Sequence, residues 1–238
     1  MARKIGILLT SNDTSDFARR FPDDGEKFIA LLAPLRPDWT FEVIRVKDNV
    51  FPESPDAFDG YIITGSPASV NGSEVWIARL MEFIRMLSDR RINVFGACFG
   101  HQAIAVALGG TVAVSPKGWG LGIAKTHFAK TAPWMQPAHC ELTLYAAHGE
   151  QVTKLPEGAV VLGGDEFCPV GAYRIGDHVF ATEYHPEMTP DFIAALIDEL
   201  DDDLDKATIG RAKASLAMPD QGKDFAQWIV NFLEYSAS

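Results

Sequence analysis

A cysteine stands between two glycines where an apolar segment gives way to a helix-like one. Residues 96–102 read Gly-Ala-Cys-Phe-Gly-His-Gln, after the apolar run 91–95 and before the stretch 102–108. A strand, Gly-x-Cys-x-Gly and a helix form the context of a nucleophile elbow, which lifts one side chain above the strand end. The positive helix N-terminus would lower the pKa of Cys98, and the thiolate is the reactive form. The alternative is a buried structural cysteine in a glycine-rich turn.

A histidine and a glutamate supply the matching base and orienting group. Residues 179–187 read Val-Phe-Ala-Thr-Glu-Tyr-His-Pro-Glu, which predicts a strand ending at His185. Residues i and i+2 of an extended chain point to the same side, so His185 and Glu187 are expected to lie together. A carboxylate that orients an imidazole is the arrangement that activates a nucleophile. Most His-x-Glu sequences are surface pairs, and the cysteine elbow is what favours the catalytic interpretation.

A third segment offers backbone donors for a developing negative charge. Residues 61–70 form an apolar run followed by a loop of small residues that contains Gly65. Without a Cβ, the amide N–H of Gly65 can approach a substrate oxygen closely. Together with the N–H of Phe99, just after the cysteine, it would form a two-donor oxyanion hole. Taken alone, the segment is more typical of an ordinary strand-to-helix connection.

These motifs together resemble the three signatures of class I glutamine amidotransferases, and the resemblance spans nearly the whole chain. More narrowly, the chain resembles stand-alone proteins similar to the glutaminase domain of GMP synthase, a subgroup that also resembles enzymes cleaving γ-glutamyl peptides. The supporting segments are residues 63–70, 96–102, 117–119, 165–176, 184–187 and 225–234. The resemblance implies a flavodoxin-like α/β fold. It also implies a Cys98 nucleophile, a His185 base and acid, a Glu187 orienting carboxylate and an oxyanion hole of Gly65 and Phe99.

The family pattern also places residues at the amino-acid end of bound glutamine. The resemblance implies that Gln102 lies near this end, and that the backbone around His148, Gly149 and Glu150 holds the α-amino and α-carboxylate groups. Many relatives have Ser-His-x-Asp here, whereas residues 146–150 of this chain read Ala-Ala-His-Gly-Glu. The Ser and Asp of many relatives are therefore absent from the segment that would bind the amino-acid end of the substrate.

Composition agrees with one α/β domain over residues 1–238. A chain of 238 residues can bury a sizeable core. Its formal net charge of −11 argues against a surface for nucleic acid or anionic membrane. Three cysteines are few and odd in number, which suits the reducing cytoplasm, and no apolar run reaches membrane-spanning length. The apolar start is too short for a signal peptide and is interpreted as the first strand.

Strand and helix signals alternate along the first half, which predicts a mostly parallel sheet with helices on both faces. Shorter strand-like runs after Gly110 predict a small antiparallel extension over the site. Two closing helices are expected at 190–206 and 222–235, with a connector at 208–221 and the acidic run 198–205 on a solvated helix face. The other expected strands are 4–10, 40–46, 58–64, 92–97, 142–147, 159–162 and 169–175, with a helix around 77–87.

The predicted chemistry is acyl transfer from glutamine or a γ-glutamyl small molecule through a thioester, without metal or organic cofactor. The remaining histidines and cysteines lack metal-ligand spacing, and no ATP-binding loop appears, so any ammonia would pass to a separate synthetase partner. Three functions stay open: a glutaminase subunit, a stand-alone γ-glutamyl peptide or conjugate hydrolase, and a non-catalytic regulatory relative. The intact Cys98, His185 and Glu187 argue against the third. An α/β-hydrolase is a weaker rival, because its acid normally precedes its histidine in the chain.

Overall fold

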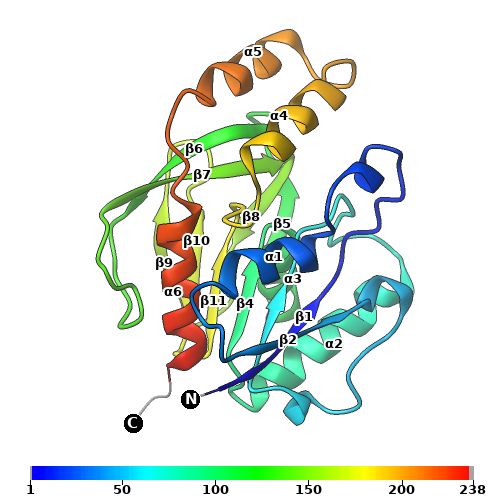
Figure 1. The fold of residues 1–238 in the computed structure, drawn as a ribbon, viewed down its shortest axis with the longest axis vertical. Helices are drawn as coiled ribbons and strands as arrows, with labels where there is room; N and C mark the ends of the chain where they lie inside the picture. Colours follow the sequence, from blue (N-terminus) through cyan, green and yellow to red (C-terminus); the bar gives the residue numbers. More distant parts are fainter. Residues whose placement is uncertain (1, 236–238) are drawn as a thin grey trace.

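The computed structural model describes residues 2–235, in which a mixed nine-stranded sheet is covered by helices on both faces (Figure 1). Five neighbouring strands are parallel, in the spatial order β2 (Thr40–Ile44), β1 (Lys4–Leu8), β3 (Gly60–Ile63), β4 (Val94–Ala97) and β11 (Val179–Thr182). Antiparallel strands continue the same sheet as β10 (Ala172–Ile175), β9 (Ala159–Gly164), β6 (Gly120–Phe128) and β7 (Glu141–His148). A separate antiparallel ribbon pairs β5 (Thr111–Val114) with β8 (Glu150–Lys154).

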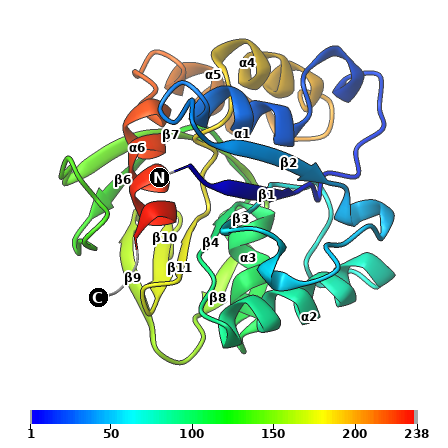
Figure 2. The ribbon, with the colours of Figure 1, turned by 60° about the horizontal axis from the view of Figure 1, so that its bottom comes forward.

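Helices cover the parallel strands from two sides, as Figure 2 shows for α1 and α2. Helices α1 (Asp24–Leu32) and α6 (Gly222–Glu234) pack on one face, while α2 (Val75–Asp89) and α3 (Phe99–Ala107) pack on the other. Helices α4 (Pro190–Glu199) and α5 (Lys206–Ser215) lie over β6 and β7. Short 3-10 helices cover Ala18–Arg20 (η1), Val46–Asp48 (η2) and Pro55–Ala57 (η3).

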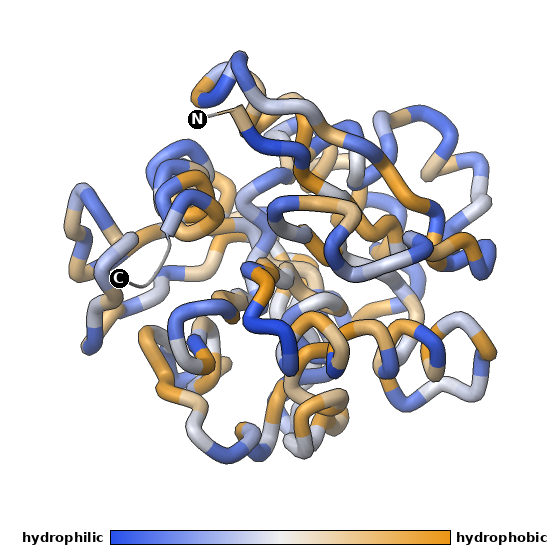
Figure 3. Tube along the Cα trace, turned by 90° about the horizontal axis from the view of Figure 1, so that it is seen from below, coloured by the Kyte–Doolittle hydropathy of each residue, from blue (hydrophilic) through white to orange (hydrophobic). Residues whose placement is uncertain are grey.

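Successive strand residues enter opposite cores, because side chains alternate between the faces of a sheet. Ile62 packs with α1 and α6, whereas its neighbour Ile63 packs with α2 and α3. Figure 3 shows the matching amphipathic pattern of the helices, in which hydrophilic and hydrophobic stretches succeed one another around each turn. Within residues 2–235, no helix is both long and apolar enough to cross a membrane.

The predicted fold class is confirmed, and the parallel strands follow the order typical of flavodoxin-like sheets. The structure ends most of the predicted strands one to three residues earlier or later than the sequence pattern suggests. Strands β3, β4 and β11 are neighbours and run in the same direction. Their carboxyl ends therefore open at one edge of the sheet, where ligands of such sheets bind.

The expectation of one helix over 190–206 followed by a connector is wrong. Helix α4 ends at Glu199, residues 201–204 form a turn, and α5 occupies most of the expected connector. Aspartates at a helix C-terminus oppose the negative end of the helix dipole, which disfavours continuation through 201–203. Asp205 then caps α5 by accepting a hydrogen bond from the amide of Thr208. The acidic run therefore lies mainly in a turn rather than on a helix face.

Candidate active site

Cys98 occupies the sharp turn between β4 and α3. Its φ of 47° and ψ of −105° lie in a region that L-residues rarely adopt, as expected of a residue lifted out of a strand. A Cβ added to Gly100 would lie 2.3 Å from the carbonyl oxygen of Ile63, and one on Gly96 would lie 2.6 Å from the carbonyl carbon of Gly100. Both glycines are needed because the first turn of α3 sits directly against β3 and β4.

His185 and Glu187 meet in the loop after β11. The imidazole Nδ1 lies 2.7 Å from Glu187 Oε1, and both side chains are buried. The expected strand is shorter than the pattern suggests, since β11 ends at Thr182. His185 is held instead by its own amide, which donates a hydrogen bond of 2.8 Å to the carbonyl of Tyr145 in β7. The structure thus places the carboxylate where it orients the ring.

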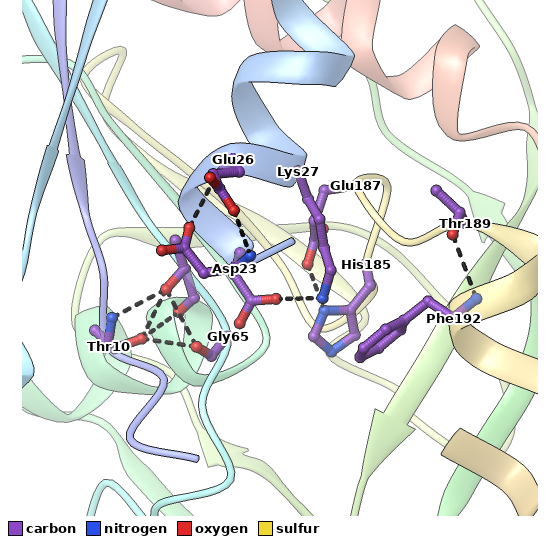
Figure 4. Close-up of polar contacts among 11 residues, drawn as sticks. Thr10, Asp23, Glu26, Lys27, Gly65, His185, Glu187, Thr189 and Phe192 are labelled. Carbon is purple, nitrogen blue, oxygen red and sulfur yellow. Dashed lines mark hydrogen bonds and ion pairs between the residues drawn. The ribbon is translucent and has the colours of Figure 1, made fainter. Parts of the chain in front are cut away.

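The loop after β3 presents Gly65 to the imidazole. A Cβ on Gly65 would lie 2.7 Å from His185 Cε1 and 3.8 Å from the Cβ of Cys98. The carbonyl of Thr64 accepts hydrogen bonds from the hydroxyl of Thr10 and the amide of Gly100 (Figure 4). Because the C=O and N–H of a trans peptide point in opposite directions, this anchoring turns the Gly65 N–H away from both donors.

The two predicted oxyanion donors are not used in hydrogen bonds within the described part of the protein. Among residues 2–235, the amide N–H groups of Gly65 and Phe99 donate no hydrogen bond. The two amides follow adjacent parallel strands, β3 and β4. They are therefore available for a substrate oxygen, and Thr10 and Thr64 hold the first of them in place.

The electrostatics of Cys98 and His185 are coupled. Burial raises the pKa of the Cys98 thiol, and His185 lowers it only in part. Burial also opposes charge on His185, but Glu187 and Cys98 together hold the pKa of the imidazole well above its ordinary value. The expectation that the helix N-terminus makes Cys98 more acidic than a free cysteine is wrong in direction, because desolvation outweighs it. His185 is instead a strong acceptor for the thiol proton.

Cys98 and His185 open into a cavity of about 640 Å³. Its inner end includes Gly65 and Trp119, and the latter covers Gly149. The outer walls come from residues 11–27 and from α4 with the residues flanking it. Apolar side chains on these walls are Phe17, Met188, Phe192, Leu196 and Leu200.

The residues predicted at the amino-acid end lie behind this cavity. The side-chain Nε2 of Gln102 donates a hydrogen bond of 2.7 Å to Glu183 Oε1 and one of 3.0 Å to the backbone carbonyl of Glu150. The same carbonyl accepts a hydrogen bond of 3.0 Å from His148 Nδ1, and the His148 ring lines a different cavity beside Phe167. The structure therefore places Gln102, His148, Gly149 and Glu150 next to one another but outside the lining of the Cys98 cavity.

A second buried histidine–glutamate pair, His101 and Glu183, lies outside the lining of the Cys98 cavity. His101 Nε2 is 3.5 Å from Glu183 Oε2, and both side chains are fully buried. Burial lowers the pKa of His101 to about 3 and raises that of Glu183 to about 8, so both groups are neutral near pH 7. The His101 ring also packs against Tyr173, with the ring centroids 4.7 Å apart.

The described part of the chain contains no cluster of three or more His, Cys, Asp or Glu side chains able to hold a metal ion. The absence of a metal stays a prediction. Residues 2–235 also contain Cys98, Cys140 and Cys168 as free thiols.

Comparisons with known proteins identify the family. A family model described as glutamine amidotransferase class-I matches residues 36–194. A γ-glutamyl peptidase 4 of Arabidopsis thaliana is 31% identical over 206 residues, which cover 83% of this chain and 81% of that protein. A glutamine-hydrolysing GMP synthase of Porphyromonas gingivalis is 30% identical over 59% of this chain and 27% of that protein. The fold matches the crystal structure of a glutamine amidotransferase from Thermotoga maritima, with a TM-score of 0.75, 15% identity and 98% coverage of both chains.

Proposed function

Because the chain belongs to the class I glutamine amidotransferase family, we propose that it hydrolyses the side-chain amide of a γ-glutamyl compound through a thioester on Cys98. One observation carries the proposal. Cys98, His185 and Gly65 follow three neighbouring parallel strands and meet in one cavity, with Glu187 hydrogen-bonded to the imidazole. A nucleophile, a base with its orienter and a backbone donor are the components of acyl transfer.

The first half of the reaction forms the thioester. His185 accepts the thiol proton while Cys98 Sγ attacks the γ-carbonyl carbon. The carbonyl oxygen becomes an oxyanion, to which the N–H groups of Gly65 and Phe99 donate. His185 returns the proton to the nitrogen, the carbon–nitrogen bond breaks, and ammonia or an amine departs.

The second half releases glutamate. His185 takes a proton from water, and the hydroxide attacks the thioester carbon. The carbon–sulfur bond then breaks, the thiolate recovers the proton from His185, and free glutamate leaves. In both halves the Glu187 carboxylate stabilises the transient imidazolium, which fits the raised pKa of His185.

The cavity favours a γ-glutamyl peptide or conjugate over glutamine alone. A volume of about 640 Å³ falls in the range of roughly 300–1,000 Å³ that holds drug-sized ligands. Apolar walls from Phe17 and α4 would contact a leaving group much larger than ammonia. A relative named as a γ-glutamyl peptidase supports this choice. The three free cysteines support a reducing compartment, and we place the protein in the cytoplasm.

The second candidate is a glutaminase subunit that delivers ammonia to a separate synthetase, and the similarity to a GMP synthase favours it. Steady-state kinetics of the isolated chain on glutamine and on γ-glutamyl dipeptides distinguish the two. We expect turnover of the dipeptides without any partner. Negligible turnover of every γ-glutamyl compound, with glutamine hydrolysis stimulated by a co-purifying protein, would restore the subunit function.

A further inference from the structure

A buried ion pair lies in the wall of the cavity that contains Cys98. Lys27 Nζ is 2.8 Å from Asp24 Oδ1, and the two side chains are 7% and 16% exposed. The ammonium also lies 3.5 Å from the centre of the Phe192 ring on α4. All three side chains line the cavity. A buried charge is costly unless it is paired, so this arrangement is a specific feature of the site.

Capping of α1 does not require Asp24. The N-cap of α1 is Asp23, whose carboxylate accepts from the amide of Glu26 at 2.9 Å, while the Glu26 carboxylate accepts from the amide of Asp23 (Figure 4). This capping box satisfies the end of the helix without Asp24. Asp24 stands in the first turn of α1, where the helix dipole favours a carboxylate, and it pairs there with an ammonium that lines the cavity.

The pair lies on the side of Cys98 from which a leaving group departs. His185 protonates the departing nitrogen in the proposed mechanism, and Asp24 is close enough to His185 and Glu187 to interact with both electrostatically. Figure 4 shows Lys27 extending from α1 toward these two residues, with Phe192 directed to the same place from α4. The amine portion of the substrate would pass between these side chains.

We propose that Lys27 is a specificity-determining residue that binds the free carboxylate of an amino acid or peptide leaving group, with Asp24 holding its ammonium in position. This inference rests on the proposed function and specifies its substrate class. When the scissile nitrogen is the α-amine of an amino acid, the carboxylate is only two bonds from that nitrogen. An ammonium beside the general acid is suitably placed for it, and the Phe192 ring provides an apolar contact for the adjoining side chain.

Asp24 leaves Lys27 able to bind a second anion. An ammonium has three donors, and Asp24 uses one of them. The fold has already removed this ammonium from water, so binding a carboxylate adds little further desolvation cost.

The test compares L-γ-glutamyl-L-alanine with L-γ-glutamyl-L-alaninamide, which lacks only the free carboxylate. We expect the wild type to prefer the acid by about tenfold in kcat/KM, as typical of a hydrogen bond to a charged group. Lys27→Met should bring the ratio to about one, Lys27→Arg should retain the preference, and Asp24→Asn should increase it. The control Lys206→Met breaks a mostly exposed ion pair with Asp201 and should leave the ratio unchanged.

Two readouts separate this inference from the proposed hydrolysis. Calorimetry with the Cys98→Ala protein measures binding of both compounds without turnover. A carboxylate preference in binding to Cys98→Ala, together with no turnover of either compound by the wild type, would refute the hydrolysis and support the subsite. If Lys27→Met lowers kcat/KM equally for the acid and for the amide, the role of Lys27 is merely structural. Should Lys27→Met not fold, the Asp24→Asn ratio decides, and a ratio that fails to rise overturns the proposal.

Discussion

The two buried histidine–glutamate pairs near Cys98 differ in the distance between their side chains and in the pKa of their histidines. In the front pair, His185 and Glu187 are 2.7 Å apart, and the pKa of the histidine is raised. In the rear pair, His101 and Glu183 are 3.5 Å apart, the pKa of the histidine falls to about 3, and that of the glutamate rises to about 8. The same two residue types thus form one pair with a raised histidine pKa beside the cavity and one pair, outside its lining, that is neutral near pH 7.

This difference shows what turns a buried pair into a catalytic one. Burial disfavours charge in both pairs, and only a short hydrogen bond with a second negative group nearby overcomes it. His185 has Glu187 and Cys98 as such neighbours, whereas the charge that acts most on His101 is another imidazole, His148. Proton transfer during catalysis is therefore expected from the front pair alone.

The largest effect is expected from replacing Cys98, the proposed nucleophile. Cys98→Ala should lower turnover of a γ-glutamyl dipeptide by at least about 10⁴-fold, because no thioester can form. A glutamine-like chloroketone should label Cys98 and spare Cys140 and Cys168. Turnover assays and peptide mapping measure these outcomes, with circular dichroism to check folding. An active alanine variant would exclude the thioester mechanism.

The two residues of the front pair should differ in role, with His185 as the base and Glu187 as the group that orients it. His185→Ala is expected to lower kcat/KM by roughly 10³–10⁴-fold, because the proton acceptor is lost. Glu187→Gln should be at least about tenfold less damaging, because the imidazole remains. Side-by-side kinetics check the ranking. Equal losses in the two variants would mean that the carboxylate does more than orient the ring.

Gly65 packs against the imidazole of the front pair, and it should be the next most sensitive position. In Gly65→Ala the new methyl carbon would meet His185 Cε1 at 2.7 Å and displace the ring. Misplacement of a catalytic group by about 1 Å costs roughly 10²-fold in rate, and this loss is expected in kcat. The control is Gly210→Ala in α5, where no atom lies within 4 Å of an added Cβ. Unchanged kcat in Gly65→Ala would contradict the close packing of the imidazole.

The front of the site could be predicted from sequence because each part depends on neighbouring residues. The elbow at Cys98, the loop at Gly65 and the His-x-Glu of residues 185–187 all follow apolar strand patterns, and parallel strands end at one edge. The fold class follows from the same alternation. The exact ends of the strands and the position of the turn between α4 and α5 differ, and the sequence pattern does not identify α1, β5, β6 or β8 individually.

The rear and outer walls could not be predicted, because they depend on contacts between distant segments. Lys27 meets Phe192 only when α1 and α4 pack over the same cavity. Nothing near Glu183 in the sequence indicates that its carboxylate is fully buried and bound to Gln102. The pKa of Cys98 likewise depends on the surrounding core, which outweighs the local effect of the helix N-terminus.

The smallest effect on activity and a distinctive effect on stability are expected at the rear pair. Glu183→Gln keeps an acceptor for the Gln102 amide, so kcat/KM should change by less than about threefold. The free energy of unfolding should respond to pH. Glu183 releases its proton near pH 4.5 when unfolded but only near pH 8 when folded. Between these values the folded wild type keeps a proton that the unfolded chain has released, so its free energy of unfolding falls as pH rises. The Glu183→Gln variant has no such proton and does not show this fall.

Glu183→Gln should thus become more stable than the wild type as pH rises from 4.5 to 8, by up to about 5 kcal/mol, and the difference should stay constant above pH 8. Urea unfolding at pH 5, 6.5 and 8 measures it. The control Glu141→Gln alters a half-exposed carboxylate paired with Lys125 and should show little of this trend. A stability difference that stays constant between pH 5 and 8 would mean that Glu183 is already ionised in the fold over this range. The contrast between a front pair with a raised histidine pKa and a neutral rear pair would then be wrong.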